Sequence, residues 1–391
     1  MPALRRLITL TALALVICSA AYSQQPAPTA LPYSESIAYK PRVFQTKSEK
    51  KSRSKAKAAA NTPFEPSRPE PPEEMPGKGP TVSEDAPITV PISVFDMRGS
   101  FVTDLKQDDF KLFVDDSEAR VLSVERRKQP LNILILLDTS PSGGEALETT
   151  KKLAVSILDQ FSANDKISVF TFAGRMKQVM PKAADRAALR TAISKIKPGG
   201  DGTSLYDSTV QLLTDFVPAA GGRSVIILVT DGVDTTSVKT SYTKALVAAE
   251  RSDVAIFPFY LDTFASTNSR SPGANLPAAV QQILRSSMLN RPTVGSTQDE
   301  YALGRLFLND LVILSGSRAI EVDLLSIGKL KVPMNIADEL SQQYYLTFSP
   351  VGSAYVGQRK HLKIRIDRPN LAVITRGSYI VGSPPSGARP Q

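Results

Sequence analysis

The chain has 391 residues, of which 42% are hydrophobic, so it is long enough to bury one large core and a second, smaller one. Its 47 Lys and Arg outnumber its 38 Asp and Glu, which gives a formal net charge of +9. The only cysteine is Cys18. If the N-terminal residues are removed on export, the composition excludes a disulfide-stapled fold and a cysteine-ligated metal site.

Residues 1–23 have the order of a secretory signal peptide. Arg5 and Arg6 precede the apolar stretch Leu7–Val16, and small residues follow near Ala21. We expect cleavage before Gln24 and a secreted or periplasmic protein of a bacterial cell envelope, a compartment that suits an exported chain without disulfides. The apolar stretch is shorter than the roughly 20 residues that span a bilayer, so an uncleaved anchor is the weaker alternative and we expect no transmembrane span in the mature chain.

Residues 24–86 form a predicted disordered linker. They contain eleven prolines and no sustained apolar period, which is typical of extended or unstructured sequence. Residues 40–57 hold eight Lys or Arg and a single acid, Glu49. We interpret this basic run as a solvated tether and expect no nucleic-acid partner. A contact with anionic envelope polymers through residues 40–57 stays open as an alternative.

Residues 87–128 change to an alternating apolar pattern, which is typical of short antiparallel strands. The same period of two returns in residues 344–381. Turn residues separate the alternating stretches, which are Ile88–Val94, Phe110–Val114 and Val121–Val124 on the first side, and Tyr345–Phe348, His361–Ile366 and Leu371–Ile380 on the second. We expect the two segments to pair into one β-rich domain, followed by a tail at residues 382–391.

Residues 129–343 alternate between strand and helix patterns, which predicts a doubly wound, mostly parallel α/β sheet. The apolar run Leu131–Leu137 is typical of a strand covered on both faces. Further strands are expected at 167–172, 224–230, 254–261 and 319–322, and helices at 146–161, 183–196, 205–216, 241–250, 301–314 and 336–343. Residues 263–300 interrupt this rhythm, and we interpret them as an insertion with one short helix near residues 278–284.

Three loops at the ends of predicted strands carry side-chain oxygens. The first begins Asp138-Thr139-Ser140-Pro141-Ser142, the second presents Thr203 behind glycines, and the third is Thr230-Asp231-Gly232. Ligands of open α/β sheets bind outside the carboxyl ends of strands, so these loops are expected to converge. Two carboxylates and three hydroxyls suit a hard divalent cation, Mg²⁺ or Mn²⁺, whereas zinc prefers nitrogen or sulfur. The alternative is that these side chains only cap helices and start turns.

The order D-x-S-x-S, then a glycine-preceded Thr, then T-D-G resembles the metal-ion-dependent adhesion site of von Willebrand factor type A (VWA) domains. All five positions match, at Asp138, Ser140, Ser142, Thr203 and Asp231. The resemblance covers roughly residues 132–345, its flanks are similar to those of a bacterial exported VWA-related subfamily, and the insertion at 263–300 departs from the compact pattern. It implies that the three hydroxyls bind the ion directly and that the two aspartates act mostly through water.

The sequence lacks the elements of a common catalytic site. His361 is the only histidine and lies in a predicted strand far from the metal loops, and neither a nucleophile elbow nor a phosphate loop occurs. We expect a non-enzymatic, metal-dependent binding or adhesion protein that engages an acidic residue of a protein ligand. One alternative is a scaffold or assembly component of an envelope complex that binds independently of metal. A Mg²⁺-dependent hydrolase is less favoured, because such sites usually have more carboxylate ligands.

Overall fold

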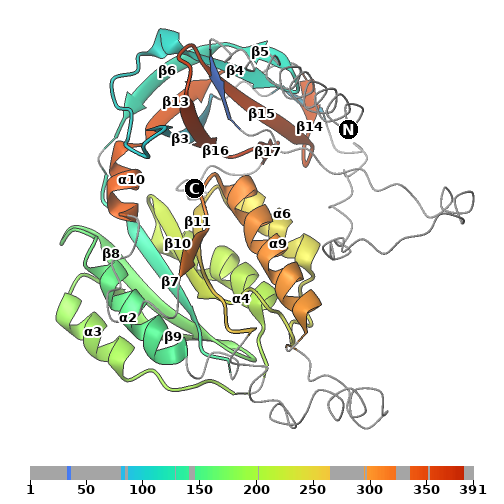
Figure 1. Ribbon diagram of the computed structural model, residues 1–391. Coiled ribbons are helices and arrows are strands. Elements are labelled where there is room, and N and C mark those ends of the chain that lie inside the picture. The colour runs from blue at the N-terminus through green and yellow to red at the C-terminus, as the bar shows by residue number, and fades with distance from the viewer. Residues whose placement is uncertain are drawn as a thin grey trace, which may run out of the picture.

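The structure is a computed structural model that describes residues 33–36, 81–83, 87–127, 129–140, 146–200, 202–264, 295, 297–322, 335–350 and 353–382. These residues form two units, an α/β domain and a β-sandwich, which lie at opposite ends of the molecule in Figure 1. The predicted signal peptide, the basic run and the helix expected near 278–284 lie outside the described residues. Within the described part, no helix has the length and apolar character needed to cross a membrane.

The α/β domain is built on a six-stranded sheet with the order β12-β11-β10-β7-β8-β9. In chain order its strands are β7 (Asn132–Asp138), β8 (Lys166–Phe172), β9 (Met176–Ala183), β10 (Ser224–Thr230), β11 (Ala255–Leu261) and β12 (Ile320–Val322). Every neighbouring pair is parallel except β8 with β9. All residues of β10 are buried. A strand covered on both faces favours apolar side chains at successive positions, which explains the continuous apolar run Val225–Val229.

Helices cover both faces of this sheet (Figure 1). Helices α2 (Ala146–Leu158), α3 (Arg186–Ser194) and α10 (Ile336–Gln342) pack on one face, against Ile133 and Ile135. Helices α4 (Leu205–Gln211), α6 (Tyr242–Ser252) and α9 (Gln298–Ser315) pack on the other face, against Leu134 and Leu136. Alternate residues of β7 therefore point into two separate cores. This arrangement confirms the predicted doubly wound, mostly parallel fold.

Three elements of the α/β domain differ from the sequence-based prediction. The edge strand β9 was not predicted, because the apolar residues of its sequence MKQVMPKA do not alternate and none of its residues is fully buried. The helix expected from residue 183 therefore begins only at Arg186, where Asp185 caps it through the amides of Ala187 and Ala188. The helix expected at 205–216 is α4 followed by a π-helical turn, Leu212–Phe216, and by the short α5 (Val217–Ala220).

The β-sandwich is made of two antiparallel sheets drawn from both sides of the α/β domain. One sheet has the order β16-β3-β13-β6, with β3 (Ile88–Asp96), β6 (Val121–Arg126), β13 (Tyr344–Phe348) and β16 (Leu371–Thr375). The other has the order β1-β15-β4-β5, with β1 (Ser34–Glu35), β4 (Phe110–Val114), β5 (Ser117–Ala119), β15 (Arg359–Ile366) and β17 (Ser378–Ile380) beside β15. A short 3₁₀ turn, Gln107–Asp109, precedes β4. The expected β-rich domain is confirmed.

Alternate residues of the two sheets share one apolar core. Val90, Ile92 and Val94 of β3 point toward Leu112 of β4 and Ile364 of β15, and all belong to a single buried cluster. This period of two is the feature from which the strands were predicted. The chain leaves the sandwich at Arg126 in β6 and returns at Tyr344 in β13, and these two residues are opposite each other in the β6–β13 ladder.

Within residues 24–86, predicted to be disordered or extended, two short parts are paired strands. Ser34 and Glu35 form β1 on the edge of β15, and β2 (Thr81–Ser83) pairs with β14 (Ser353–Tyr355). Side chains hold β1 in place: Leu371 N donates to Ser34 Oγ over 2.9 Å, and Arg365 binds Glu35. Apolar periodicity could not reveal this strand, because polar side chains secure it.

A buried ionic network joins the two units. The Glu250 side chain of α6 has no exposed surface and accepts from Arg359 of β15, with Nη2 2.7 Å from Oε2. Ser378 Oγ also donates to Glu250, and Arg376 binds both Asp253 and the Glu250 carbonyl oxygen. A buried carboxylate is tolerated only when cations and hydrogen-bond donors surround it. The α/β domain and the sandwich are thus fixed to each other away from the carboxyl ends of the parallel strands.

Candidate metal centre

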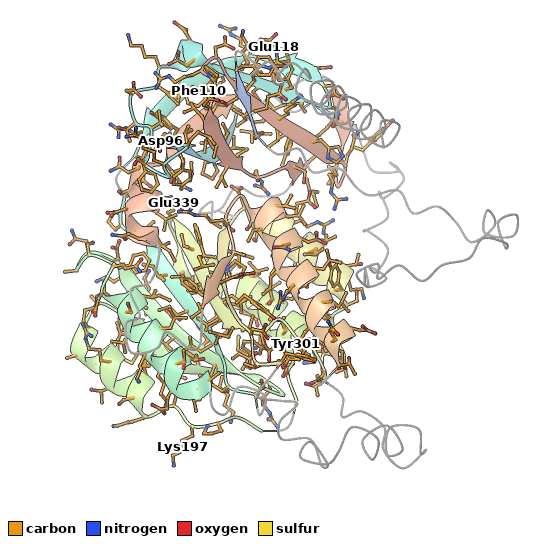
Figure 2. The ribbon with its side chains drawn as sticks, viewed as in Figure 1. Asp96, Phe110, Glu118, Lys197, Tyr301 and Glu339 are labelled. Atoms are coloured by element: carbon orange, nitrogen blue, oxygen red, sulfur yellow. The ribbon has the colours of Figure 1, made fainter. Side chains whose placement is uncertain are left out.

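The carboxyl end of β7 lies beside that of β10, which brings the first and third predicted loops together. The two strands are parallel with Leu137 opposite Val229, so the following residues, Asp138 and Thr230, are neighbours. Thr230 Oγ1 donates to Asp138 Oδ2 over 2.8 Å. Figure 2 labels Tyr301 at this end of the molecule, opposite the sandwich residues Phe110 and Glu118. The register of the sheet therefore places both aspartate loops at one edge.

The second loop is bonded to the first through its backbone. The amide of Gly199 donates to the Thr139 carbonyl over 2.7 Å. A Cβ at position 199 would lie 2.4 Å from the Cβ of Ala173, so only glycine allows this approach. Next to it, the amide of Ser204 donates to the Ala173 carbonyl over 2.7 Å. Glycine at 199 therefore lets the segment that carries Thr203 lie directly against the end of β8 and the first loop.

The second loop is also bonded to the third. Thr203 N donates to Thr235 Oγ1 over 2.8 Å, and the Thr203 carbonyl accepts from the amides of Thr235 and Thr236 over 2.8 and 3.1 Å. Gly202 has a φ of +81° and touches Thr236, which favours glycine there as well. Each of the three loops is thus hydrogen-bonded to the other two. The convergence expected from their positions at strand ends is present in the described residues.

Four of the five predicted site residues are described, and all four are buried. The exposed fractions are 6% for Asp138, 1% for Ser140, 4% for Thr203 and 3% for Asp231. Ser142, the fifth predicted residue, lies outside the described residues. Buried carboxylates and hydroxyls at a sheet edge need partners, because leaving such groups unsatisfied away from water costs free energy.

The two aspartates destabilise each other's charge. Burial and the negative charge of Asp231 raise the pKa of Asp138 to about 7, although hydrogen bonds from Ser140 and Thr230 act in the opposite direction. Ser140 N, for example, donates to Asp138 Oδ1 over 2.9 Å. A divalent cation placed near both carboxylates would remove this repulsion. The donor set of carboxylate and hydroxyl oxygens therefore fits a hard divalent ion.

Asp231 is held at both of its carboxylate oxygens. Val233 N donates to Oδ1 over 3.0 Å, and Thr263 Oγ1 donates to Oδ2 over 2.7 Å. The Thr263 hydroxyl oxygen is also 2.8 Å from the hydroxyl of Tyr301 in α9. These contacts fix the plane of the carboxylate before any ion is bound.

Sequence reasoning missed three residues of this arrangement. Thr230 stands within the recognised T-D-G motif, but no role was assigned to it. Thr263 follows β11, and the rule that placed the other loops at strand ends would have pointed to it. Tyr301 is 38 residues beyond Thr263 in sequence, so no local pattern could connect the two.

Two further acids at this edge secure a loop. Asp234 accepts from Tyr206 N over 2.9 Å and from Ser237 Oγ over 2.6 Å, and Asp207 accepts from the amide of Val238 over 3.1 Å. Across the part of the chain that the structure describes, no three His, Cys, Asp or Glu side chains gather as metal ligands do. The hydroxyl-bearing arrangement around Asp138 and Asp231 is the candidate site because the three loops meet there.

The α/β domain resembles proteins of a known family. Residues 132–283 match the profile of the von Willebrand factor type A domain family. A segment of 113 residues, 27% of this chain, is 36% identical to the uncharacterized protein sll0103 of Synechocystis sp.. The matched segment spans about a quarter of that protein, 26% of its length.

Solved structures with a similar chain path come from bacteria and from a mussel. An aerotolerance-related membrane protein of Bacteroides fragilis is 20% identical, and the match covers 51% of this chain and 100% of that one, with a TM-score of 0.36. BatB of Bacteroides thetaiotaomicron is 18% identical over 54% of this chain and 98% of its own, with a TM-score of 0.36. The mussel byssus protein PTMP1, solved with a zinc-occupied MIDAS motif, is 16% identical over 56% of this chain and 47% of its own, with a TM-score of 0.37.

The family match covers strands β7 to β11 and helices α2 to α6, whereas α9, β12 and α10 follow it in the chain. The α/β domain of this chain, matched over residues 132–283, is a von Willebrand factor type A domain.

Proposed function

We propose that this protein is an exported binding protein that captures an acidic residue of a protein partner through one Mg²⁺ or Mn²⁺ ion. Asp138, Ser140, Ser142, Thr203 and Asp231 would hold the ion, and residues 1–23 would direct export. The observation that carries the proposal is the pair of buried aspartates, Asp138 and Asp231, at the point where three mutually bonded loops meet. VWA domains are usually non-catalytic binding domains, which agrees with this assignment.

The chemistry of the donor set explains why a partner carboxylate would be favoured. Hydroxyl ligands leave most of the positive charge of a divalent ion in place, and the bound ion would attract an anionic oxygen. The protein also fixes the direction of its own ligands. Asp138 and Asp231 are oriented by Thr230 and Thr263, and Thr203 is held by its backbone to the third loop. An oriented set of ligands loses little conformational freedom when the ion and the partner bind.

Metal binding itself is the first test. Calorimetric titration with Mg²⁺ and with Mn²⁺ should give one site per chain for the wild type and no binding for Asp138→Ala. The Asp138→Ala variant should fold, because it removes a buried carboxylate whose charge is repelled by Asp231. Asp159→Asn is the control: Asp159 is exposed, follows α2 and pairs with Arg190 outside the metal centre. It should bind metal as the wild type does. Normal Mg²⁺ binding by Asp138→Ala would refute the site.

Partner capture is the second test. Immobilised protein should retain envelope proteins in Mg²⁺, lose them in EDTA, and lose them with the Asp138→Ala variant. Equal retention in Mg²⁺ and EDTA would refute the metal bridge and would favour the metal-independent scaffold. Blocking the carboxylates of the retained protein by amidation should release it, since the proposal requires an acidic ligand.

A further inference from the structure

We propose that Tyr301 is a positioning residue of the metal centre, which acts through Thr263 on Asp231 and makes helix α9 the support of the site. This inference rests on the proposed metal binding, and it adds two residues that neither the sequence motif nor the family match assigns. The three side chains form a buried chain of hydroxyl and carboxylate groups. Their exposed fractions are 3% for Tyr301, 2% for Thr263 and 3% for Asp231.

The direction of the hydrogen bonds follows from the number of protons available. Thr263 has a single hydroxyl proton, and Oγ1 donates it to Asp231 Oδ2, which lies at 2.7 Å and carries no proton when ionised. The contact of 2.8 Å between Thr263 Oγ1 and the Tyr301 hydroxyl must then have Tyr301 as its donor. Tyr301 thus donates to Thr263, and Thr263 donates to Asp231. Such a chain polarises each successive bond in a buried setting.

Helix α9 meets the same loop at a second point, one turn further along. A Cβ on Gly304 would lie 2.6 Å from the carbonyl carbon and oxygen of Gly232, the residue after Asp231. The helix backbone is therefore in direct contact with the Asp231 loop. Residues three apart lie on one face of a helix, so Tyr301 and Gly304 present a single surface to this loop. The position of α9 consequently sets where Asp231 lies.

A third contact fixes α9 to the neighbouring strand end. Arg305 Nε donates to the hydroxyl of Tyr260 over 2.9 Å, and Arg305 Nη2 binds Asp262 Oδ2 over 2.9 Å. Tyr260 and Asp262 flank the last residue of β11, directly before Thr263. The first half of α9 is therefore attached both to the residues that precede Thr263 and to Thr263 itself. A shift of this part of the helix cannot leave Thr263 unmoved.

The expected effect follows from the behaviour of groups that orient metal ligands. Removing such a partner typically weakens metal affinity about 10- to 100-fold, because the ligand loses its fixed direction. Thr263 contacts Asp231 directly, so Thr263→Val should weaken Mg²⁺ binding within that range, about 10- to 100-fold. Tyr301 is one hydrogen bond further from Asp231, so Tyr301→Phe should weaken Mg²⁺ affinity less, on the order of 3- to 10-fold.

The test is a calorimetric titration of the full chain with Mg²⁺ and Mn²⁺ at one pH, with thermal unfolding measured in parallel. Tyr242→Phe is the matched control. The Tyr242 hydroxyl is also buried, and it donates to Asp310 of α9 over 2.7 Å, but it lies outside the chain that ends at Asp231. Both Phe variants should lose similar thermal stability, whereas only Tyr301→Phe should weaken metal binding. Thr263→Ser keeps the hydroxyl and should retain most of the affinity that Thr263→Val loses.

Other outcomes would overturn the inference in identifiable ways. If Tyr301→Phe and Tyr242→Phe weaken Mg²⁺ binding equally, a general loosening of α9 is responsible and Tyr301 has no specific role. In a second outcome, the wild type binds Mg²⁺ and Asp138→Ala does not, while Tyr301→Phe and Thr263→Val keep the wild-type affinity. That result would refute the positioning role and leave the proposed function intact. A wild type that binds neither ion would refute both. Should Tyr301→Phe fail to fold, the comparison of Thr263→Ser with Thr263→Val decides.

Discussion

Lowering the pH should weaken Mg²⁺ binding, because a proton competes with the ion for Asp138. Burial and the charge of Asp231 raise the pKa of this carboxyl from 3.8 to about 7 in the absence of metal. Mg²⁺ requires the ionised form, so its affinity should rise with pH and level off above the raised pKa. With a pKa of about 7, roughly a tenth of the carboxyl is ionised at about pH 6 and roughly nine tenths at about pH 8, which predicts a ~10-fold difference in affinity.

The metal-free protein should show the opposite trend in stability. The folded state binds the proton more tightly than the unfolded chain, so the contribution of Asp138 to the free energy of unfolding is largest at low pH. It is lost as the pH rises toward the pKa of about 7. Between about pH 6 and about pH 8 the tenfold factor corresponds to a loss of roughly 1 kcal/mol. Saturating Mg²⁺ should restore stability at the higher pH, where the ion binds best.

The assay pairs calorimetric Mg²⁺ titrations with urea unfolding in EDTA, each at both pH values. Titration in two buffers of different ionisation enthalpy should show close to one proton released per Mg²⁺ bound at the lower pH and almost none at the higher pH. Asp138→Asn is the control, since its amide does not titrate, and the difference in stability between the two pH values should shrink by the predicted amount. Equal Mg²⁺ affinities at the two pH values in the wild type would refute the reasoning.

Two other changes have outcomes that can be derived from packing. Glu250→Ala leaves Arg359 without its buried carboxylate partner at the junction of the two units, and urea unfolding should show a loss of about 3–5 kcal/mol; a loss below about 1 kcal/mol would mean that solvent reaches the network. A Gly→Ala change such as Gly304→Ala would stabilise an ordinary helix by up to about 1 kcal/mol. Here the added Cβ would collide with the backbone of Gly232, so thermal unfolding should instead show a loss of stability of about 1–3 kcal/mol. Mg²⁺ binding should be weaker as well. An increase in melting temperature would contradict that contact.

Much of the fold was predictable because buried positions recur at regular intervals along strands and helices, and apolar residues occupy them. The run Leu131–Leu137 indicated a strand covered on both faces, and β7 is such a strand. The alternation in residues 88–94 indicated a half-buried strand, and β3 pairs on both sides in the sandwich. Strand β9 gave no such signal, because an exposed edge strand buries too few side chains to impose a pattern. Strand β1 was missed for a different reason, since polar contacts of Ser34 and Glu35 hold it in place.

The candidate site was predictable as far as its residues follow strand ends. Asp138, Thr203 and Asp231 each belong to a loop whose position was set by the α/β rhythm, and the structure brings these loops together. What the sequence could not reveal is how the ligands are held. Thr230 differs from an ordinary core threonine only through the register of β7 and β10. Tyr301 reaches Thr263 only because α9 packs against the end of β11.

The place where the chain leaves and re-enters the sandwich has an evolutionary consequence. Arg126 and Tyr344 face each other across one step of the β6–β13 ladder, so the entire VWA domain is joined to the sandwich at two points about 5 Å apart. A domain whose two ends are neighbours can be inserted into a host strand pair, or replaced there, without changing the path of the host. The sandwich therefore has the geometry of a host domain in which one inserted domain can be exchanged for another. Recombination at this pair of strands could present a different domain on the same base, provided that it matched the contact surface between the units, which includes the Glu250 network and the hydrogen bond from Gly377 N to the Ile313 carbonyl.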